Sequence, residues 1–263
     1  MIKVATWNMK QAVAPKKKLS DLWEWTDSEI NADLMVLTEA KVPTDGPPTG
    51  WTAHWTPNGI GPRRRWGTVL AARGIELRPL TEVSVKRKTH ALSAPWDAVL
   101  QIADVMIDGH RWATLVGMYG LTVDSSGASC GHGDHSVSVL IRTISPLLDS
   151  DRGDRVIVAG DMNLWPKHAS YKFDRLGLID LIEWTGDERA PLERCANCNG
   201  NPGCGHMWTH KNGNSPNAAV QQIDFIFATE ELGKELIHIK GGIADFPDSW
   251  EVSDHAPVVA TFS

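Results

Sequence analysis

The chain has 263 residues, of which 42% are hydrophobic and 22% are charged, and its formal net charge is −6. This length suits one large domain or two small ones, and it allows a substantial core without disulfides or metal supports. The negative charge argues against a protein that coats nucleic acid by bulk attraction. No stretch approaches the ~20 apolar residues of a membrane-spanning helix, so we expect no membrane association.

The N-terminal residues MIKVATWNMK lack the apolar core of a signal peptide. We therefore expect a cytoplasmic protein whose four cysteines are reduced or bound to metal. No protein partner is inferable from the sequence.

Short apolar runs of strand length recur along the chain and outnumber the helical segments. The predicted strands are Ile2–Thr6, Leu34–Leu37, Thr68–Ala71, Ala98–Ile107, Trp112–Met118, Val156–Ala159, Ile223–Ala228, Leu236–Ile239 and Pro257–Phe262. Helical spacing predicts one helix from Leu19 to Ile30 and a second from Val137 to Leu148, with Ser136 as its N-cap. This pattern favours an α/β layered sandwich, in which sheets pack face to face with helices outside. No linker is evident, so we expect one domain over residues 1–263, with an inserted loop at 185–221.

Polar or ionisable side chains stand at the ends of these strands. They are Asn8, Glu39, Tyr119, Asp161, Asn163, Asp254 and His255, with Asp224 inside an otherwise apolar strand. Any one of them is more often a turn former or a cap than a functional group. Their recurrence favours a shared site, whose carboxylate and amide oxygens suit Mg²⁺ or Mn²⁺ rather than zinc.

Asp224 needs a partner, because an unpaired buried charge costs several kcal/mol. His255 is the candidate partner, since an aspartate beside a histidine orients the ring and raises its basicity. The alternative is a structural ion pair that closes the fold.

Six motifs follow one another between residues 6 and 258: TWN, TEAK, MYG, GDMNLWP, QIDFIFAT and SDHAPV. In this order they resemble the endonuclease/exonuclease/phosphatase superfamily, which includes DNase I-like nucleases, abasic-site endonucleases, deadenylases, inositol polyphosphate phosphatases and sphingomyelinases. The resemblance implies a four-layered α/β sandwich, with two packed β-sheets flanked by helices. It also implies hydrolysis of a phosphate ester by in-line attack of water, with Mg²⁺ or Mn²⁺ as cofactor.

The resemblance implies a metal site at Glu39, the main ligand, with Asn8 and Asp254 beside it. Many members carry an acidic residue two positions after the asparagine of the first motif, where this chain has Lys10. That departure removes one potential ligand and favours a site with one metal ion.

The resemblance also implies the catalytic groups. Asp161 is expected to orient or deprotonate the attacking water, and Asn163 and Tyr119 to contact phosphate oxygens. His255 is expected to face the scissile phosphate, with Asp224 holding its ring. The sequence leaves open whether Asp161 or His255 is the general base.

Two further departures bear on specificity. Gln222 and Phe225 stand where the superfamily commonly has arginine and tyrosine. The run YGLT after the MYG strand replaces the YVPN-like run of abasic-site endonucleases, which argues against a dedicated abasic-site enzyme.

A cysteine cluster, CANCNGNPGCGH, forms a second dense signal. Cys195, Cys198, Cys204 and His206 have the spacing C-x2-C-x5-C-x-H, which predicts a closed structural Zn²⁺ site in a loop around 190–210. His210 is a weaker fifth candidate. The alternatives are a reduced surface cluster or a disulfide between Cys195 and Cys198.

Candidate substrate-binding residues lie in loops. Arg63, Arg64 and Arg65 form one of three basic triplets, with Lys16–Lys18 and Lys86–Lys88, which together hold nine of the 26 Lys and Arg residues. Trp51, Trp55 and Trp66 lie near the arginine triplet in sequence resembling loops and would offer surfaces on which bases stack. His132 and His135 belong to the loop CGHGDH, which is expected at the mouth of the site. For the basic triplets, the alternative is that each lies in a solvated surface loop. For the CGHGDH loop, the alternative is a Gly-rich turn.

These observations favour a divalent-metal-dependent phosphodiesterase, most simply a nuclease on DNA or RNA. The alternatives are a phosphomonoesterase or a phospholipid or sphingomyelin phosphodiesterase of the same superfamily. An inactive binding module is less consistent with the sequence, because the glutamate, the GDMN motif and the SDH motif are all present.

Overall fold

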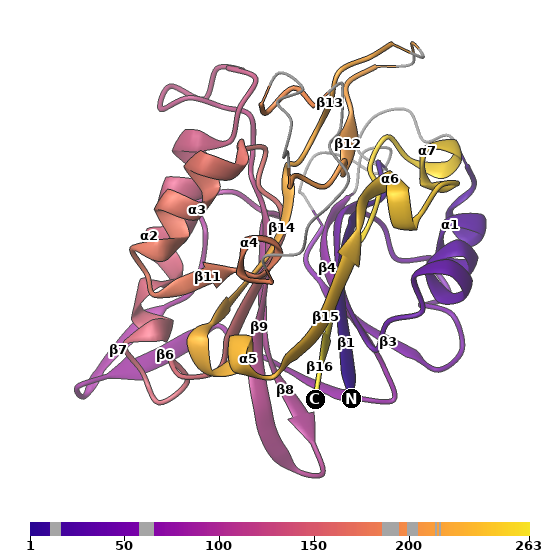
Figure 1. Ribbon diagram of the computed structural model, residues 1–263. Coiled ribbons are helices and arrows are strands. Elements are labelled where there is room, and N and C mark those ends of the chain that lie inside the picture. The colour runs from indigo at the N-terminus through magenta and orange to yellow at the C-terminus, as the bar shows by residue number, and fades with distance from the viewer. Residues whose placement is uncertain (11–16, 58–65, 186–194, 199–204, 214, 216) are drawn as a thin grey trace.

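Two six-stranded sheets pack face to face at the centre of the fold (Figure 1). The computed structural model describes residues 1–10, 17–57, 66–185, 195–198, 205–213, 215 and 217–263. In the first sheet the strand order is β15-β16-β1-β2-β4-β3, and in the second it is β11-β14-β10-β9-β8-β5. The first sheet consists of β1 (Ile2–Asn8), β2 (Leu34–Ala40), β3 (Trp51–Trp55), β4 (Gly67–Arg73), β15 (Leu236–Gly241) and β16 (Val258–Phe262). The second consists of β5 (Glu76–Pro79), β8 (Leu100–Ile107), β9 (His110–Tyr119), β10 (Val156–Asp161), β11 (Leu178–Asp180) and β14 (Asp224–Thr229).

Helices cover the outer face of each sheet. α1 (Leu19–Trp25) continues into a π-helical turn, η1 (Thr26–Ile30), against the first sheet, and α2 (Asp134–Leu148) and α3 (Pro166–Asp174) lie against the second. The short helices are α4 (Leu181–Trp184), α5 (Glu230–Lys234), α6 (Gly242–Asp245) and α7 (Ser249–Val252). Two small hairpins complete the elements, β6 (Glu82–Val85) with β7 (Lys88–Ala91), and β12 (His210–Lys211) with β13 (Val220–Gln221).

The core has three layers of apolar side chains, because the central strands are buried on both faces. In β1, Val4 points into the layer between the sheets, whereas Ala5 and Trp7 point toward α1. In β14, Ile226 points between the sheets and Phe227 toward α2 and α3. Burial on both faces explains the nearly continuous apolar runs of these strands. The four-layered α/β sandwich predicted from the sequence is therefore confirmed.

Several local predictions need correction. The strand predicted from Ala98 begins at Leu100, because Ala98 has a left-handed backbone with φ of 70°. Ser136 is not the N-cap of α2. It lies inside the first turn of the helix, and its hydroxyl donates to the carbonyl oxygens of Leu121 and Gly133.

The interpretation of the tryptophans as loop residues is wrong for two of them. Trp51 and Trp55 lie in β3, a strand absent from those predicted. Trp51 is buried in the core beside Trp23, so its ring is not available for stacking on a base. Trp66 packs its ring edge against Tyr119 with a centroid separation of 5.3 Å.

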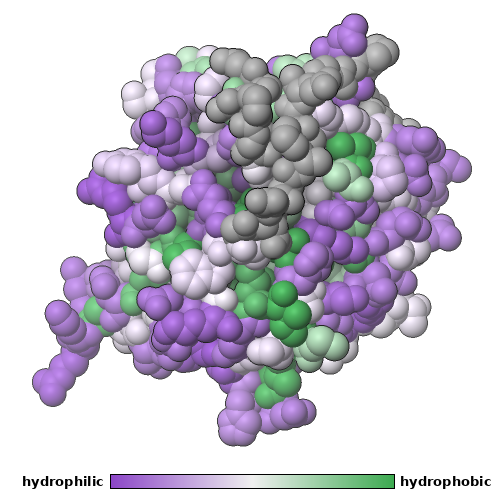
Figure 2. Space-filling model, in the orientation of Figure 1, coloured by the Kyte–Doolittle hydropathy of each residue, from purple (hydrophilic) through white to green (hydrophobic). Residues whose placement is uncertain are grey.

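The surface is polar over most of the face seen in Figure 2, where hydrophobic side chains form small separate groups. None of the helices in the described ranges has the length and apolar character needed to cross a bilayer.

Candidate active site

The ends of parallel strands bring polar side chains from both sheets to one edge of the sandwich. β1 and β2 run parallel in the first sheet and end near Asn8 and Glu39, and β9 and β10 run parallel in the second and end at Tyr119 and Asp161. β14 runs antiparallel to β10, and its first residue, Asp224, pairs directly with Asp161. The topology therefore gathers residues that lie far apart in the sequence.

A buried trio of Asp161, Asp224 and His255 forms the centre of the site. A 2.9 Å hydrogen bond joins His255 Nδ1 to Asp224 Oδ2, and His255 Nε2 lies 3.9 Å from Asp161 Oδ2. The structure thus pairs Asp224 with His255, the partner expected from the sequence. Asp161 is 1% exposed, Asp224 is 0% exposed and His255 is 5% exposed. The trio lies out of solvent, where charge interactions are strong.

Burial and the charges within the trio shift the pKa values of Asp161 and His255. Burial, and next the Asp224 carboxylate, raise the pKa of Asp161 to about 7. Burial by itself would lower the pKa of His255, but Asp224, Asp161 and Asp254 outweigh it and raise that pKa to about 10. His255 is therefore an imidazolium at neutral pH, held between carboxylates.

Hydrogen bonds from β1 and from the segment before β12 anchor the loop that carries His255. The indole Nε1 of Trp7 donates to the His255 carbonyl oxygen at 3.0 Å. The Ser253 hydroxyl donates to the Asn8 carbonyl oxygen at 2.8 Å and accepts from the His255 amide at 3.1 Å. Thr209 O accepts from the Ala256 amide on the other side of the loop. These bonds fix His255 from β1 and from the segment before β12.

Asn8 contacts Asp161. Its Nδ2 donates to Asp161 Oδ2 at 2.9 Å, and its Oδ1 accepts from the Lys10 amide at 2.8 Å. Both polar ends of the Asn8 side chain therefore have protein partners, and the side chain orients the Asp161 carboxylate. The prediction that Asn8 is a metal ligand stays a prediction.

Glu39 and Tyr119 meet across the two sheets. The Tyr119 hydroxyl donates to Glu39 Oε1 at 2.7 Å. Burial, together with the charges of Glu39 and Asp161, raises the pKa of Tyr119 well above its ordinary value, so the phenol stays protonated. Glu39 has a left-handed backbone with φ of 44° and lies at an irregularity in the pairing of β2 with β4. Such strain in a residue other than glycine is common at functional sites.

Lys10 forms an ion pair with Asp254 Oδ2. The two side chains are 23% and 20% exposed, so the pair lies at the rim of the buried trio. Burial would raise the pKa of Asp254, but His255 and Lys10 hold it below its ordinary value. The residue that departs from the superfamily pattern thus contacts one of the predicted metal ligands.

Asn163 is held in a tight turn after β10. Its amide donates to Asp161 Oδ1 at 2.9 Å, and its Nδ2 donates to the Gly120 carbonyl oxygen at 2.9 Å. Its φ of 48° is left-handed. Gly120 and Gly133 press against the Met162 carbonyl oxygen so closely that an added Cβ would lie 2.2 Å from it in each case. These glycines permit the approach that places Asp161 and Asn163.

A pocket of 410 Å³ opens beside Asn163, and its lining includes His132, Asp134, Trp165, His168 and Ile223. The Trp165 side chain is 53% exposed, which is unusual for so large an apolar residue. The pocket adjoins Asn163 and does not contain the buried trio. His132 thus lines a cavity next to the site, whereas His135 packs against Trp96.

Sequence reasoning missed two residues of the site. The His210 ring lies against the His255 ring with a centroid separation of 4.5 Å. Burial, and next the charge of His255, lower the pKa of His210 to about 3, so this ring is neutral. Trp165 was also missed, although it follows Asn163 by two positions in the GDMNLWP motif.

The basic triplets do not all meet at this site. Lys86–Lys88 forms the tip of the β6–β7 hairpin, which Figure 1 shows at the far end of the fold from β12 and β13. Arg63, Arg64, Arg65 and Lys16 lie outside the described residues.

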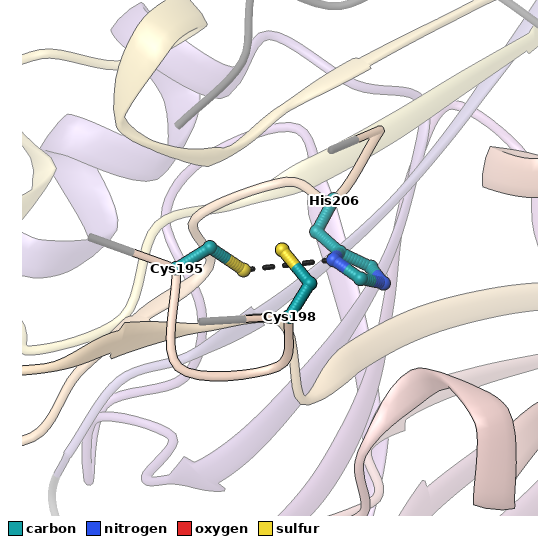
Figure 3. Close-up of side chains that lie close together, drawn as sticks. All are labelled: Cys195, Cys198 and His206. Carbon is teal, nitrogen blue, oxygen red and sulfur yellow. Dashed lines mark hydrogen bonds between the residues drawn. The ribbon is translucent and has the colours of Figure 1, made fainter. Parts of the chain in front are cut away.

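Three of the four predicted zinc ligands lie together in the loop before β12. The side chains of Cys195, Cys198 and His206 point toward one another (Figure 3), and their ligand atoms all lie within 4.8 Å of one another. Cys204 lies outside the described residues. His210 is not part of this group, because its ring packs on His255.

The oxygen-rich site itself fits a hard divalent cation. The described part of the site holds four carboxylates and two cations. Asp161 and Asp224 flank His255, Asp254 pairs with Lys10, and Glu39 accepts from the Tyr119 hydroxyl. This surplus of negative charge, in a set of carboxylate and amide donors, suits Mg²⁺ or Mn²⁺.

Solved structures with the same fold cover the whole chain. An AP endonuclease from Archaeoglobus fulgidus is 18% identical, with a TM-score of 0.67 over 100% of both chains. The 3′ phosphatase NExo from Neisseria, bound to a product DNA hairpin, is 15% identical, with a TM-score of 0.66 over 100% of both chains. D. rerio TDP2 complexed with single-strand DNA product is 17% identical, with a TM-score of 0.64 over 100% of this chain and 98% of that one.

No protein-family model and no curated protein matches the chain. The structural likeness is therefore one of fold, and it is the fold that the six sequence motifs imply. The chain has the DNase I-like fold of the endonuclease/exonuclease/phosphatase superfamily.

Proposed function

We propose that the chain is a divalent-metal-dependent phosphodiesterase that acts on nucleic acid, with residues 1–263 forming one catalytic domain. The observation that carries this proposal is the buried trio, in which His255 lies between Asp224 and Asp161. Glu39 and Asp254 lie at the edge of the trio, and no nucleophilic serine or cysteine is needed, because water attacks the phosphorus. Mg²⁺ or Mn²⁺, held by Glu39 and Asp254 with Asn8 beside them, would neutralise charge on the phosphate oxygens.

The pKa values of His255 and Asp161 support the following acid and base roles. His255, whose pKa is about 10, is protonated at neutral pH and donates from Nε2 to a phosphate oxygen. Asp161, whose pKa is about 7, is the group that accepts the proton of the attacking water. Asn8 and the Asn163 amide each donate to Asp161, so the carboxylate has a fixed orientation toward the water. Asp224 holds the His255 ring.

Two uncharged side chains could donate hydrogen bonds to the phosphate oxygens of the substrate. Asn163 lines the pocket, and Tyr119, whose hydroxyl is protonated, donates to Glu39 on the other side of Asp161 in the strand pairing. Both would donate to phosphate oxygens as negative charge builds up in the transition state. The exposed Trp165 ring in the same pocket would stack on a base or sugar.

A basic groove between α2 and α3 supports a polymeric substrate. It has a volume of 380 Å³, and its lining includes Arg142, Tyr171, Lys172 and Arg175. Lys172 forms an ion pair with Asp134, which also lines the pocket beside Asn163. A strand that passed the active site would find cations for its backbone and the exposed Tyr171 ring for its bases.

The test is a comparison of substrates and metals. Purified protein is incubated with Mg²⁺, Mn²⁺ or EDTA against single- and double-stranded DNA, RNA, abasic DNA, a 3′-phosphorylated oligonucleotide and sphingomyelin. We expect metal-dependent cleavage of a nucleic acid, which Asp161→Ala and His255→Ala abolish. The control is His135→Ala, which is expected to retain activity because its ring packs against Trp96.

Each other outcome points elsewhere. Activity confined to the 3′-phosphate indicates a phosphomonoesterase, and activity confined to sphingomyelin indicates a phospholipid-type phosphodiesterase. Activity that persists in EDTA, or in both alanine variants, contradicts the mechanism. Tight binding of nucleic acid without turnover indicates a binding module.

A further inference from the structure

The cysteine loop has the geometry of a metal site. Cys195 Sγ lies 3.5 Å from His206 Nδ1, and the ligand atoms of Cys195, Cys198 and His206 all lie within 4.8 Å of one another. Around a tetrahedral zinc ion, bond lengths of about 2.1 Å to nitrogen and about 2.3 Å to sulfur place neighbouring ligand atoms roughly 3.6–3.8 Å apart. If the separations between these ligand atoms shortened by about 1 Å, they would match the spacing around a tetrahedral zinc ion.

We propose that Cys195, Cys198 and His206 bind a Zn²⁺ ion that fastens the loop at 195–198 to the segment at 206–211. Two thiolates and an imidazole are the borderline-soft donors that zinc prefers over Mg²⁺. The three side chains come from two stretches of chain and point toward one another, as Figure 3 shows. The loop has little core of its own, since Cys195 is buried while Cys198 and His206 are half-buried, so a bound ion would supply the missing stabilisation.

The first zinc-binding stretch is bonded to the strand that leads to Asp224. The Ala196 amide donates to the Val220 carbonyl oxygen at 2.8 Å, and Asn197 Oδ1 accepts from the Gln222 amide at 2.8 Å. Gln222 is 1% exposed, and its Oε1 accepts from the Met207 amide at 2.9 Å. The neutral glutamine in place of the common arginine thus links both zinc-binding stretches, two residues before Asp224.

The second stretch is bonded to the loop that carries His255. Thr209, three residues after His206, accepts through Oγ1 from the Asp224 amide at 3.2 Å and through its carbonyl oxygen from the Ala256 amide at 2.7 Å. The Lys211 amide donates to the Asp254 carbonyl oxygen at 2.9 Å. The zinc ion would therefore hold in place the two segments on which the Asp224–His255 pair rests. The proposal that zinc binds does not depend on the proposed nuclease activity. The proposal that zinc supports catalysis rests on that activity.

Metal content tests the site directly. The full chain, purified under reducing conditions without chelator and dialysed against Mg²⁺, is expected to contain about one zinc ion per chain. Cys198→Ser and His206→Ala are expected to lose it. Cys130→Ser is the matched control, because Cys130 lies near His132 and outside the cluster, and it is expected to keep its zinc. Glu39→Gln is also expected to keep it, which excludes binding at the oxygen-rich site.

Hydrogen exchange tests the link to the catalytic pair. In Cys198→Ser, the amides of Ala196, Met207 and Gln222 are expected to exchange at least about tenfold faster than in the zinc-loaded wild type. The hairpin Glu82–Ala91 is expected to exchange as before. A wild type without zinc, or a Cys198→Ser variant that keeps it, overturns the site. Zinc loss with unchanged exchange overturns the link. Both outcomes are read without activity, so they are distinguishable from failure of the proposed function.

Discussion

A 2.9 Å hydrogen bond joins His255 Nδ1 to Oδ2 of Asp224, a residue 31 positions earlier in the chain. Asp224 is the first residue of β14, and His255 lies in the loop before β16, so the bond connects the two sheets. The other Asp224 oxygen, Oδ1, is buried and has no hydrogen-bond partner among the described residues. The imidazolium is therefore the main group that balances the charge of this carboxylate.

Replacing Asp224 with asparagine is expected to disable the His255 acid. The Asp224 carboxylate is the largest contribution raising the pKa of His255, so Asp224→Asn lowers that pKa toward neutrality. We expect kcat to fall about 10²–10⁴-fold, and the alkaline limb of the pH–rate profile to move to lower pH. Asp21→Asn, on the exposed face of α1, is the control. An unshifted alkaline limb in Asp224→Asn would show that His255 does not act as the acid.

Replacing Asp161 with asparagine is expected to change the pH dependence of stability. The folded-state pKa of Asp161, about 7, lies above its unfolded value of 3.8, so its protonated form stabilises the fold and that contribution is lost as pH rises through 7. Asparagine does not ionise, so Asp161→Asn removes this pH-dependent loss of stability. Relative to wild type, the variant is expected to gain about 3 kcal/mol in unfolding free energy between pH 5 and pH 8.

Urea unfolding at pH 5 and pH 8, in EDTA, measures this difference. EDTA is needed because a bound cation would stabilise the ionised carboxylate and mask the effect. Asp21→Asn is expected to follow the wild type at both pH values. Equal pH dependence of Asp161→Asn and wild type would place the Asp161 pKa near its ordinary value and weaken its assignment as the base.

The central strands could be predicted because their burial on both faces forces near-continuous apolar sequence. β1, β2, β4, β9, β10 and β16 lie close to the predicted runs. The edge strand β15 was also predicted, as Leu236–Ile239. The edge strands β3 and β5 were missed, because they are short and largely exposed, so polar residues interrupt their apolar pattern.

The residue types of the site were predictable, but their contacts were not. The motifs identify Asp161 and Asp224, whereas the antiparallel register that sets them side by side depends on the pairing of β10 with β14. His210 reaches His255 only because β12 lies beside the last loop, and nothing in its own sequence neighbourhood marks that contact. Tertiary pairing of this kind has no local sequence signal.

Adding a methyl group at Gly120 is expected to displace the catalytic turn. An alanine Cβ there would lie 2.2 Å from the Met162 carbonyl oxygen, a backbone atom that cannot move without shifting Asp161 and Asn163. Gly120→Ala is expected to cost about 1–3 kcal/mol of stability and to lower kcat more than it raises KM. Gly46→Ala is the comparison for kcat, because an added Cβ would meet no atom within 4 Å there. The φ of 100° at Gly46 strains an alanine, so this variant is expected to lose stability but to leave kcat unchanged. Wild-type kcat in Gly120→Ala would contradict this account of the turn.

Removing the cations of the groove between α2 and α3 is expected to weaken binding of long substrates. In the variant Arg142→Ala/Arg175→Ala, the slope of log affinity against log salt is expected to decrease by about 1–2. Cleavage of a small phosphodiester that cannot reach the groove is expected to stay unchanged. Lys86→Ala, at the tip of the β6–β7 hairpin, is the control and is expected to retain the wild-type slope. An unchanged slope in the double variant would exclude the groove from the nucleic-acid path.

Lys10 is expected to assist catalysis as a fixed positive charge. Its ammonium pairs with Asp254 at the rim of the trio and helps to hold the pKa of that carboxylate low. Lys10→Met is therefore expected to raise the pKa of Asp254 and to lower kcat/KM about 10–100-fold, with Lys10→Arg retaining much of the activity. Lys10→Glu restores an acidic residue at this position and is expected to bind Mn²⁺ more tightly than wild type, measured by paramagnetic resonance of the free ion. If Lys10→Met were more active than wild type, the ammonium would be blocking Asp254 rather than assisting the reaction.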